Sequence, residues 1–277
     1  MTATVARASE IDPERTGTGA LVTTVLDTRG VGGRLVRRLV EVGAAAAHAG
    51  TAGPGGELWF MIAGEGELRC EPGERTAQRV REGQGIWLPA GIRYELRAAG
   101  PEPARLDSVV LPGAGRASGS PEAGSPETRP TETSSPETGS SSSPESGAAA
   151  PLVSDLSSCA VERTGNRTFR VLFGPGRGCD AATQFVGEIP PGRAPVHSHT
   201  YDEVVLVLAG AGIAHVNGAG HGLEPGTCVY LPPGQQHCLE NAGPGTLVVL
   251  GVFQPGGSPA AKTEAGPRQA AGAEAAP

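Results

Sequence analysis

Apolar residues along this chain alternate with polar ones or gather in short runs, which is typical of β-strands rather than helices. Gly and Pro residues separate these runs and favour turns between them. The pattern therefore predicts an all-β protein without long helices. The predicted strands lie at 21–26, 39–42, 58–62 and 85–88, and then at 169–173, 183–189, 204–208, 212–216, 227–231 and 246–253.

The two groups of predicted strands repeat each other. Glu57 stands 146 residues before Glu203, and Gly83 stands 143 residues before Gly226, with neighbouring Gly and Pro residues in matching places. Internal repeats of this kind indicate one structural unit used more than once. The chain is therefore predicted to contain two similar domains.

The sequence between the repeats differs from both of them in composition. Ser-Pro-Glu occurs there four times, among Gly, Ser and Thr. Because such a segment has too little apolar surface to offset its ordering entropy, it is predicted to be a disordered linker, with a phosphorylated regulatory tether as the alternative. The predicted divisions are a frayed start at 1–18, a first barrel at 19–112, the linker at 113–154, a second barrel at 155–255 and a disordered tail at 256–277.

Net charge and cysteine content indicate which binding partners and which cellular compartment suit the protein. The net charge of −7 argues against nucleic acid and anionic membranes as partners. The five cysteines are odd in number and indicate a reducing compartment, and the N-terminus lacks an apolar signal segment. We therefore expect a soluble, cytoplasmic protein that acts on a small molecule and forms a homodimer through barrel packing.

A cluster of metal-ligand residues marks the second repeat. His197 and His199 are two residues apart, Glu203 follows, and His237 comes from the next predicted hairpin. In a strand, residues i and i+2 point to the same face, so both imidazoles can approach one ion. Three imidazoles and a carboxylate suit a divalent transition metal such as Fe, Mn, Ni, Cu, Co or Zn, of which the sequence does not select one.

Two motifs around these residues resemble those of the cupin superfamily. The first reads Gly192-x4-His197-x-His199-x3-Glu203-x6-Gly210, with its leading Gly one residue closer to the His than usual. The second matches at every position and reads Gly226-x5-Pro232-x-Gly234-x2-His237-x3-Asn241. The resemblance covers roughly 165–255 and implies a jelly-roll β-barrel that binds a single metal through the motif residues.

The first repeat departs from the motif where the ligands would stand. Counted from Glu57, the positions of the paired histidines hold Thr51 and Gly53, and Tyr94 replaces the third histidine. A loop shift could bring in His48 at most. We therefore expect a two-domain cupin, or bicupin, with a degenerate N-terminal barrel that has a structural role.

The chemistry expected at such a site leaves several classes open. The resemblance favours a dioxygenase acting on a phenolic, enol or dicarbonyl metabolite. A redox-neutral isomerase, lyase, decarboxylase or cyclase and a non-catalytic metal- or ligand-binding cupin are the alternatives. Glu203 is predicted to be an adaptable ligand that can act as general base. Strand alternation nominates Gln184 and Tyr230 as substrate-binding residues, although Tyr230 could equally pack between the barrels.

Neighbouring polar residues are interpreted as structural. His215 and His221 fall outside the motif positions, and Asp202 would face away from Glu203 on a strand. Cys228 and Cys238 lie near the second motif, and packing as small buried side chains is favoured over thiol chemistry.

Overall fold

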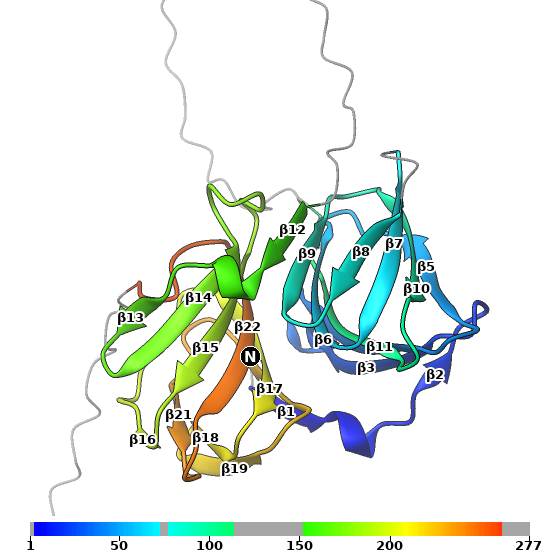
Figure 1. Cartoon of the computed structure of the whole chain (residues 1–277). Coiled ribbons are helices and arrows are strands. Elements are labelled where there is room, and N and C mark those ends of the chain that lie inside the picture. Colours follow the sequence, from blue (N-terminus) through cyan, green and yellow to red (C-terminus); the bar gives the residue numbers. More distant parts are fainter. Residues whose placement is uncertain (1–2, 73–76, 114–151, 262–277) are drawn as a thin grey trace, which may run out of the picture.

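The computed structural model describes residues 3–72, 77–113 and 152–261, and it shows two β-barrels side by side (Figure 1). Each barrel consists of one seven-stranded and one four-stranded antiparallel sheet. The prediction of an all-β fold with two jelly-roll barrels is confirmed. In the described part of the chain, no helix is long and apolar enough to cross a membrane.

The N-terminal barrel is built mainly from the first repeat. Its sheets have the strand orders β12-β9-β6-β11-β4-β3-β2 and β5-β10-β7-β8. The strands are β2 (Glu14–Arg15), β3 (Leu21–Asp27), β4 (Val36–Val42), β5 (Ala47–Thr51), β6 (Glu57–Ala63), β7 (Glu65–Glu71), β8 (Gln78–Arg81), β9 (Gln84–Leu88), β10 (Arg93–Ala98), β11 (Ala104–Val110) and β12 (Leu152–Asp155).

The C-terminal barrel repeats this arrangement strand for strand. Its sheets have the orders β1-β20-β17-β22-β15-β14-β13 and β16-β21-β18-β19. The strands are β1 (Thr4–Arg7), β13 (Glu162–Thr164), β14 (Arg167–Phe173), β15 (Thr183–Ile189), β16 (Gly192–Arg193), β17 (Asp202–Ala209), β18 (Gly212–Val216), β19 (Ala219–Leu223), β20 (Thr227–Leu231), β21 (His237–Asn241) and β22 (Leu247–Gln254).

The two barrels exchange their edge strands. β1 comes from the N-terminus but pairs with β20 of the C-terminal barrel, whereas β12 follows the linker in sequence but pairs with β9 of the N-terminal barrel. A 3-10 helix follows each of them, η1 (Ala8–Glu10) and η3 (Leu156–Ser158); a third, η2 (Thr28–Val31), follows β3. Each exchanged strand covers a sheet edge that would otherwise expose unpaired backbone groups.

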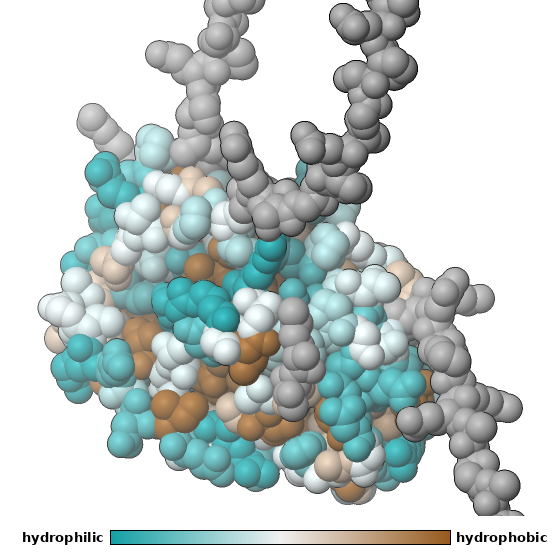
Figure 2. Space-filling model, turned by 180° about the vertical axis from the view of Figure 1, so that it is seen from behind, coloured by the Kyte–Doolittle hydropathy of each residue, from teal (hydrophilic) through white to brown (hydrophobic). Residues whose placement is uncertain are grey.

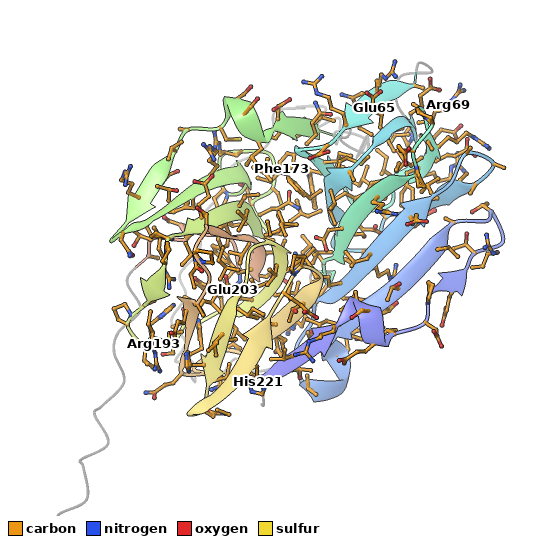
Figure 3. The ribbon with its side chains drawn as sticks, turned by 60° about the horizontal axis from the view of Figure 1, so that its bottom comes forward. Glu65, Arg69, Phe173, Arg193, Glu203 and His221 are labelled. Carbon is orange, nitrogen blue, oxygen red and sulfur yellow. The ribbon has the colours of Figure 1, made fainter. Side chains whose placement is uncertain are left out.

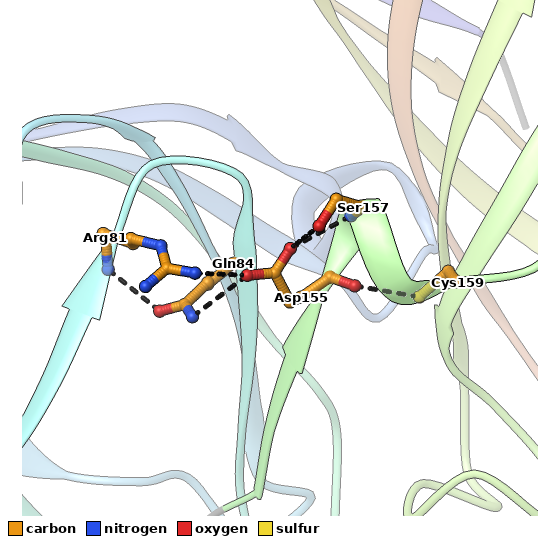
Figure 4. A network of polar contacts seen from close by, with 5 residues as sticks. All are labelled: Arg81, Gln84, Asp155, Ser157 and Cys159. Carbon is orange, nitrogen blue, oxygen red and sulfur yellow. Dashed lines mark hydrogen bonds and ion pairs between the residues drawn. The ribbon is translucent and has the colours of Figure 1, made fainter.

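Polar contacts hold β12 at this edge, as Figure 4 shows. Arg81 Nη2 donates to Asp155 Oδ2 at 2.9 Å, and Gln84 Nε2 donates to the same oxygen at 3.4 Å. The other carboxylate oxygen of Asp155 accepts from the Ser157 backbone N–H at 3.0 Å and begins η3. Asp155 therefore joins strand β12, the following helix and the N-terminal barrel.

These pairings correct the predicted boundaries. Residues 152–154 are strand rather than disordered linker, and the predicted frayed start contains β1 and β2. β12 and β1 pair with strands far away in sequence, whereas β2 pairs with the adjacent β3. In the predicted tail, Gly256 and Gly257 bond to Ala181 and Thr183 on the second barrel. The predictions of disorder at 114–151 and 262–277 concern residues outside those described.

The seven-stranded sheets bury both of their faces. On β17, Val205 and Val207 point into the C-terminal barrel, whereas Val204 and Leu206 join a cluster shared with the N-terminal barrel. The N-terminal strand β6 divides its residues in the same way. This explains why both strands are continuous apolar runs instead of alternating ones. On the surface seen from behind, hydrophobic residues form small groups among polar ones (Figure 2).

Buried polar side chains in the interface between the barrels form an ion pair and hydrogen bonds. Arg37 and Asp107 form an ion pair at 2.8 Å with both side chains inaccessible to solvent. Arg37 Nη2 also donates to the Leu250 carbonyl of the other barrel at 3.2 Å, and Gln184 Nε2 donates to the Trp59 carbonyl at 3.3 Å. A side chain of each barrel thus donates to a backbone carbonyl of the other barrel.

Candidate metal centre

Three histidine side chains meet inside the C-terminal barrel. His197 and His199 lie in the segment between β16 and β17, and His237 begins β21. The backbones of His197 and His237 exchange hydrogen bonds of 2.9 and 2.8 Å, and Gly234 N–H donates to the His199 carbonyl at 2.7 Å. One ring nitrogen of each imidazole lies within 4.8 Å of one ring nitrogen of the other two.

Hydrogen bonds orient two of the rings. His197 Nδ1 lies 3.1 Å from the Pro195 carbonyl, and His237 Nδ1 lies 2.9 Å from the Gln235 carbonyl. Because a carbonyl oxygen only accepts, each Nδ1 must carry the proton, which leaves the lone pair on Nε2. A metal-ligating histidine is usually held in this way by the group on its other nitrogen.

Burial keeps these imidazoles neutral. Burial lowers the pKa of His197, and it lowers the pKa of His237 to about 4. Neutral imidazole is the form that binds metal ions. The two rings are therefore ready to act as ligands at neutral pH without first losing a proton.

Glu203 lies against the histidines from strand β17, in the barrel interior (Figure 3). Its side chain is buried, and Oε2 lies 3.2 Å from His199 Nε2. Burial acts to raise the pKa of Glu203, but the hydrogen bond from His199 and the nearby imidazoles hold it below its ordinary value. The carboxylate is thus ionised in a buried position that only nearby cationic or donor groups can stabilise.

The donor set fits a divalent ion. Two ligand atoms each about 2.1 Å from one ion at a right angle are about 3 Å apart, close to the spacing of Glu203 and His199. The buried Nδ1 of His199 has no hydrogen-bond partner among the described residues. Among those residues, no second group of three such side chains is close enough to hold an ion.

A small cavity of about 100 Å³ opens in front of these residues. Phe185, Val205 and Leu231 line its apolar walls, and Arg167 and Tyr201 stand among its polar lining. The Tyr201 ring stacks on His199 with centroids 4.5 Å apart and on Phe253 at 4.3 Å. Sequence reasoning missed Arg167 and Tyr201, although Tyr201 is two residues from Glu203 and strand alternation would have nominated it.

Gln184 and Tyr230 do not line this cavity, so their predicted role in substrate binding is wrong. Both side chains are inaccessible and face the other barrel. Gln184 bonds to the Trp59 carbonyl, and the Tyr230 hydroxyl donates to Asp202 Oδ1 at 2.6 Å. Because these strands are buried on both faces, alternation alone separates the faces without showing which one is the barrel interior.

The residues interpreted as structural have structural contacts. His215 Nε2 lies 2.6 Å from Glu240 Oε2, and His221 lies exposed on β19. Asp202 is the acceptor for Tyr230 and stands apart from the three-histidine group. Cys228 and Cys238 are free and buried, and burial raises the pKa of Cys228 to about 12, which suppresses the reactive thiolate.

The N-terminal barrel fills the corresponding space with side chains. Tyr94 lies opposite Gly50, as His237 lies opposite His197. Gly91 N–H donates to the Ala52 carbonyl, as Gly234 donates to His199. The predicted equivalents Thr51 and Gly53 are therefore wrong by one residue, because the loop before Glu57 differs in length.

His48 enters this interior two residues before Gly50. Its ring packs 5.4 Å from Trp59 and 5.3 Å from Tyr94, and the Trp59 indole donates to Glu57 Oε2 at 2.9 Å. Glu57, the carboxylate that this barrel retains, therefore accepts a hydrogen bond from Trp59. Aromatic rings fill the place where the other barrel gathers its three histidines.

Comparisons with known proteins agree with this geometry. Residues 185–253 match the family model described as cupin domain. No curated protein sequence matches the chain. The region matched spans the histidines, Glu203 and most of the second barrel.

Solved structures share the two-barrel fold at low sequence identity. Protein Ylba from E. coli has a TM-score of 0.67 at 10% identity, covering 91% of this chain and 90% of its own. A mutant of Bacillus subtilis oxalate decarboxylase has 0.66 at 15%, covering 92% and 77%. A putative glyoxylate induced protein from Pseudomonas aeruginosa has 0.66 at 14%, covering 91% and 87%.

The match to the cupin domain model therefore covers most of the second barrel, and the solved structures share the fold of both barrels. The C-terminal barrel, which contains the matched region, holds the three-histidine site, and the described residues of the N-terminal barrel have the same fold without those ligands.

Proposed function

We propose that the C-terminal barrel binds one divalent transition metal through His197, His199 and His237, with Glu203 as the fourth ligand. The convergence of three imidazoles within 4.8 Å is the observation that carries this proposal. The hydrogen bonds that orient His197 and His237, and the buried carboxylate beside His199, support it. The metal would supply a Lewis acid that polarises an oxygen-bearing substrate.

We further propose that the protein is an enzyme of the redox-neutral class, such as a lyase or decarboxylase, for a small oxygen-bearing metabolite. The cavity of about 100 Å³ is smaller than a cavity of about 150 Å³ that accommodates benzene. A small aliphatic molecule therefore suits it better than a phenolic ring. The oxalate decarboxylase named among the structural neighbours acts on a molecule of this size class and is consistent with the proposal.

The residues of the site would have different roles in the reaction. The imidazoles hold their positions through backbone hydrogen bonds, whereas Glu203 can accept a proton at Oε2. The stack of Tyr201 on His199 and Phe253 excludes water on one side of the site. A polarised substrate would thus lie between a fixed set of ligands and one adaptable base.

Measurement of metal content, followed by measurement of oxygen uptake, tests the proposal. The purified full chain should bind one equivalent of Mn(II) or Co(II), and His237→Ala should lose it, whereas His215→Ala should retain it. An oxygen electrode then separates the two enzyme classes with small carboxylic acids, enols and dicarbonyls as substrates. Turnover without oxygen uptake is expected; stoichiometric oxygen uptake would instead favour the dioxygenase class, which stays a prediction from the sequence.

A further inference from the structure

Arg167 stands at the junction of two cavities. It begins strand β14 and lines the small inner cavity together with the three histidines. It also lines an outer cavity of about 460 Å³ that contacts His197, His199 and Pro259. A molecule entering the metal centre from the outer cavity would therefore pass the Arg167 guanidinium.

Most N–H donors of the Arg167 guanidinium have no hydrogen-bond partner among the described residues. Among the described residues, its only hydrogen bond is from Nη2 to the Leu239 carbonyl at 3.0 Å. Arg170, three residues along the same strand, instead forms an ion pair with Glu188 at 2.8 Å. No carboxylate of the described chain lies within 4 Å of the Arg167 guanidinium, although the residue is partly buried.

Charge at the two cavities is otherwise anionic or neutral. Arg167 is the only Lys or Arg among the described residues that line them. The acidic lining residues already have partners, since Glu203 contacts His199 and Glu188 pairs with Arg170. A partly buried cation that lacks a carboxylate partner favours an anion that approaches through the cavity.

We propose that Arg167 binds a carboxylate group of the substrate while the substrate's other oxygen faces the three histidines. This inference rests on the proposed function and narrows its substrate class to small hydroxy- or oxo-carboxylic acids. A guanidinium presents paired N–H donors that match the two oxygens of a carboxylate. Arg167 would therefore select the acid over its neutral amide and orient it toward the histidines.

The cavity sizes agree with this placement. The inner cavity of about 100 Å³ admits a group of only a few heavy atoms, whereas the outer one has room for a longer acid. Both cavities include Arg167, His197 and His199. The carboxylate would thus sit at the boundary, with the reacting end inside.

Glycolate and glycolamide are a matched pair of probes, because they have the same number of heavy atoms and differ in charge. Binding of each to the Co(II)-loaded full chain is measured by calorimetry and by the visible spectrum of the metal. Arg167→Gln and Arg167→Lys are compared with wild type. Arg163→Gln is the control, because Arg163 is exposed on the neighbouring strand β13.

Arg167→Gln should weaken glycolate binding by about 10- to 100-fold, as expected for the loss of a charged hydrogen bond. Arg167→Lys should recover part of this loss, and Arg163→Gln should bind as wild type does. Glycolamide should bind weakly to all variants. Equal binding of glycolate to wild type and Arg167→Gln would overturn the inference, and so would a loss of metal in Arg167→Gln, which would assign Arg167 to maintaining the site.

A failure of the proposed function is distinguishable from a failure of this inference. If wild type holds no metal, the proposed function fails. The metal-free chain then still tests Arg167, since glycolate should shift the Arg167 Nε–H resonance in a spectrum of the 15N-labelled protein. Absence of that shift would overturn the role of Arg167 independently of any metal.

Discussion

Gly50 lies opposite Tyr94 in the N-terminal barrel, in the register that His197 and His237 have in the C-terminal barrel. A Cβ atom at Gly50 would stand 2.8 Å from the Tyr94 hydroxyl oxygen. The Tyr94 side chain is buried and packs its ring 4.7 Å from Trp59. In the N-terminal barrel, the Tyr94 side chain therefore fills the place of a metal ligand, and its hydroxyl fits there because residue 50 is a glycine without a Cβ atom.

This relationship predicts that Gly50→Ala destabilises the N-terminal barrel by about 1 kcal/mol, because a Cβ on the exposed Gly50 would push the end of the buried Tyr94 side chain out of position. Adding Tyr94→Phe should recover part of the loss by removing the hydroxyl. Both tryptophans, Trp59 and Trp87, belong to this barrel, so urea unfolding followed by tryptophan fluorescence reports on it. An unchanged midpoint for Gly50→Ala would contradict the prediction.

Glu203→Gln should separate metal binding from turnover. The amide coordinates weakly but does not accept a proton, so turnover should fall by about 10²-fold or more while metal stays bound at saturating concentration. Parallel measurement of metal content and rate checks this. Glu240→Gln is the matched control, because Glu240 contacts His215 outside the site. Full turnover in Glu203→Gln would show that Glu203 is not the base.

The exchanged strands predict that cutting the linker does not separate the barrels. A protease site placed at residue 130 should give two fragments that elute together in size-exclusion chromatography, because β1 and β12 each remain paired with the other fragment's barrel. Separation should require denaturant. Deletion of residues 1–11 is a companion test, and it should destabilise the C-terminal barrel by exposing the edge of β20. Elution of two separate folded fragments would refute the exchange.

His48 predicts that acid destabilises the N-terminal barrel. Burial lowers the pKa of His48 from 6.5 to about 4, so the unfolded chain binds more protons than the folded one between these values. The unfolding free energy therefore falls as pH falls from 6.5 toward 4, by up to about 3 kcal/mol. His48→Gln should flatten this dependence in tryptophan-monitored unfolding. A parallel pH profile in the variant would assign the effect to other groups.

Much of the fold and the core of the site could be predicted from local sequence. Strand periodicity and turn residues placed the more apolar strands of both repeats but not the more polar ones, such as β5 and β8. The motif spacing selected His197, His199, Glu203 and His237, which the fold brings together. These features depend on short-range spacing along the chain. His197 and His199 lie between β16 and β17 rather than in a strand, so the motif spacing identified them and strand alternation did not place them.

Other features were decided by tertiary structure. Whether Gln184 and Tyr230 face the cavity or the N-terminal barrel depends on which side of a doubly buried sheet encloses the site. The pairings of β1 and β12 join segments far apart in sequence, and no local pattern encodes a partner at that distance. Arg167 belongs to the site only because the fold brings β14 to the cavity that the histidines line. Local geometry follows from the sequence, but which surfaces meet depends on the packing of the whole chain.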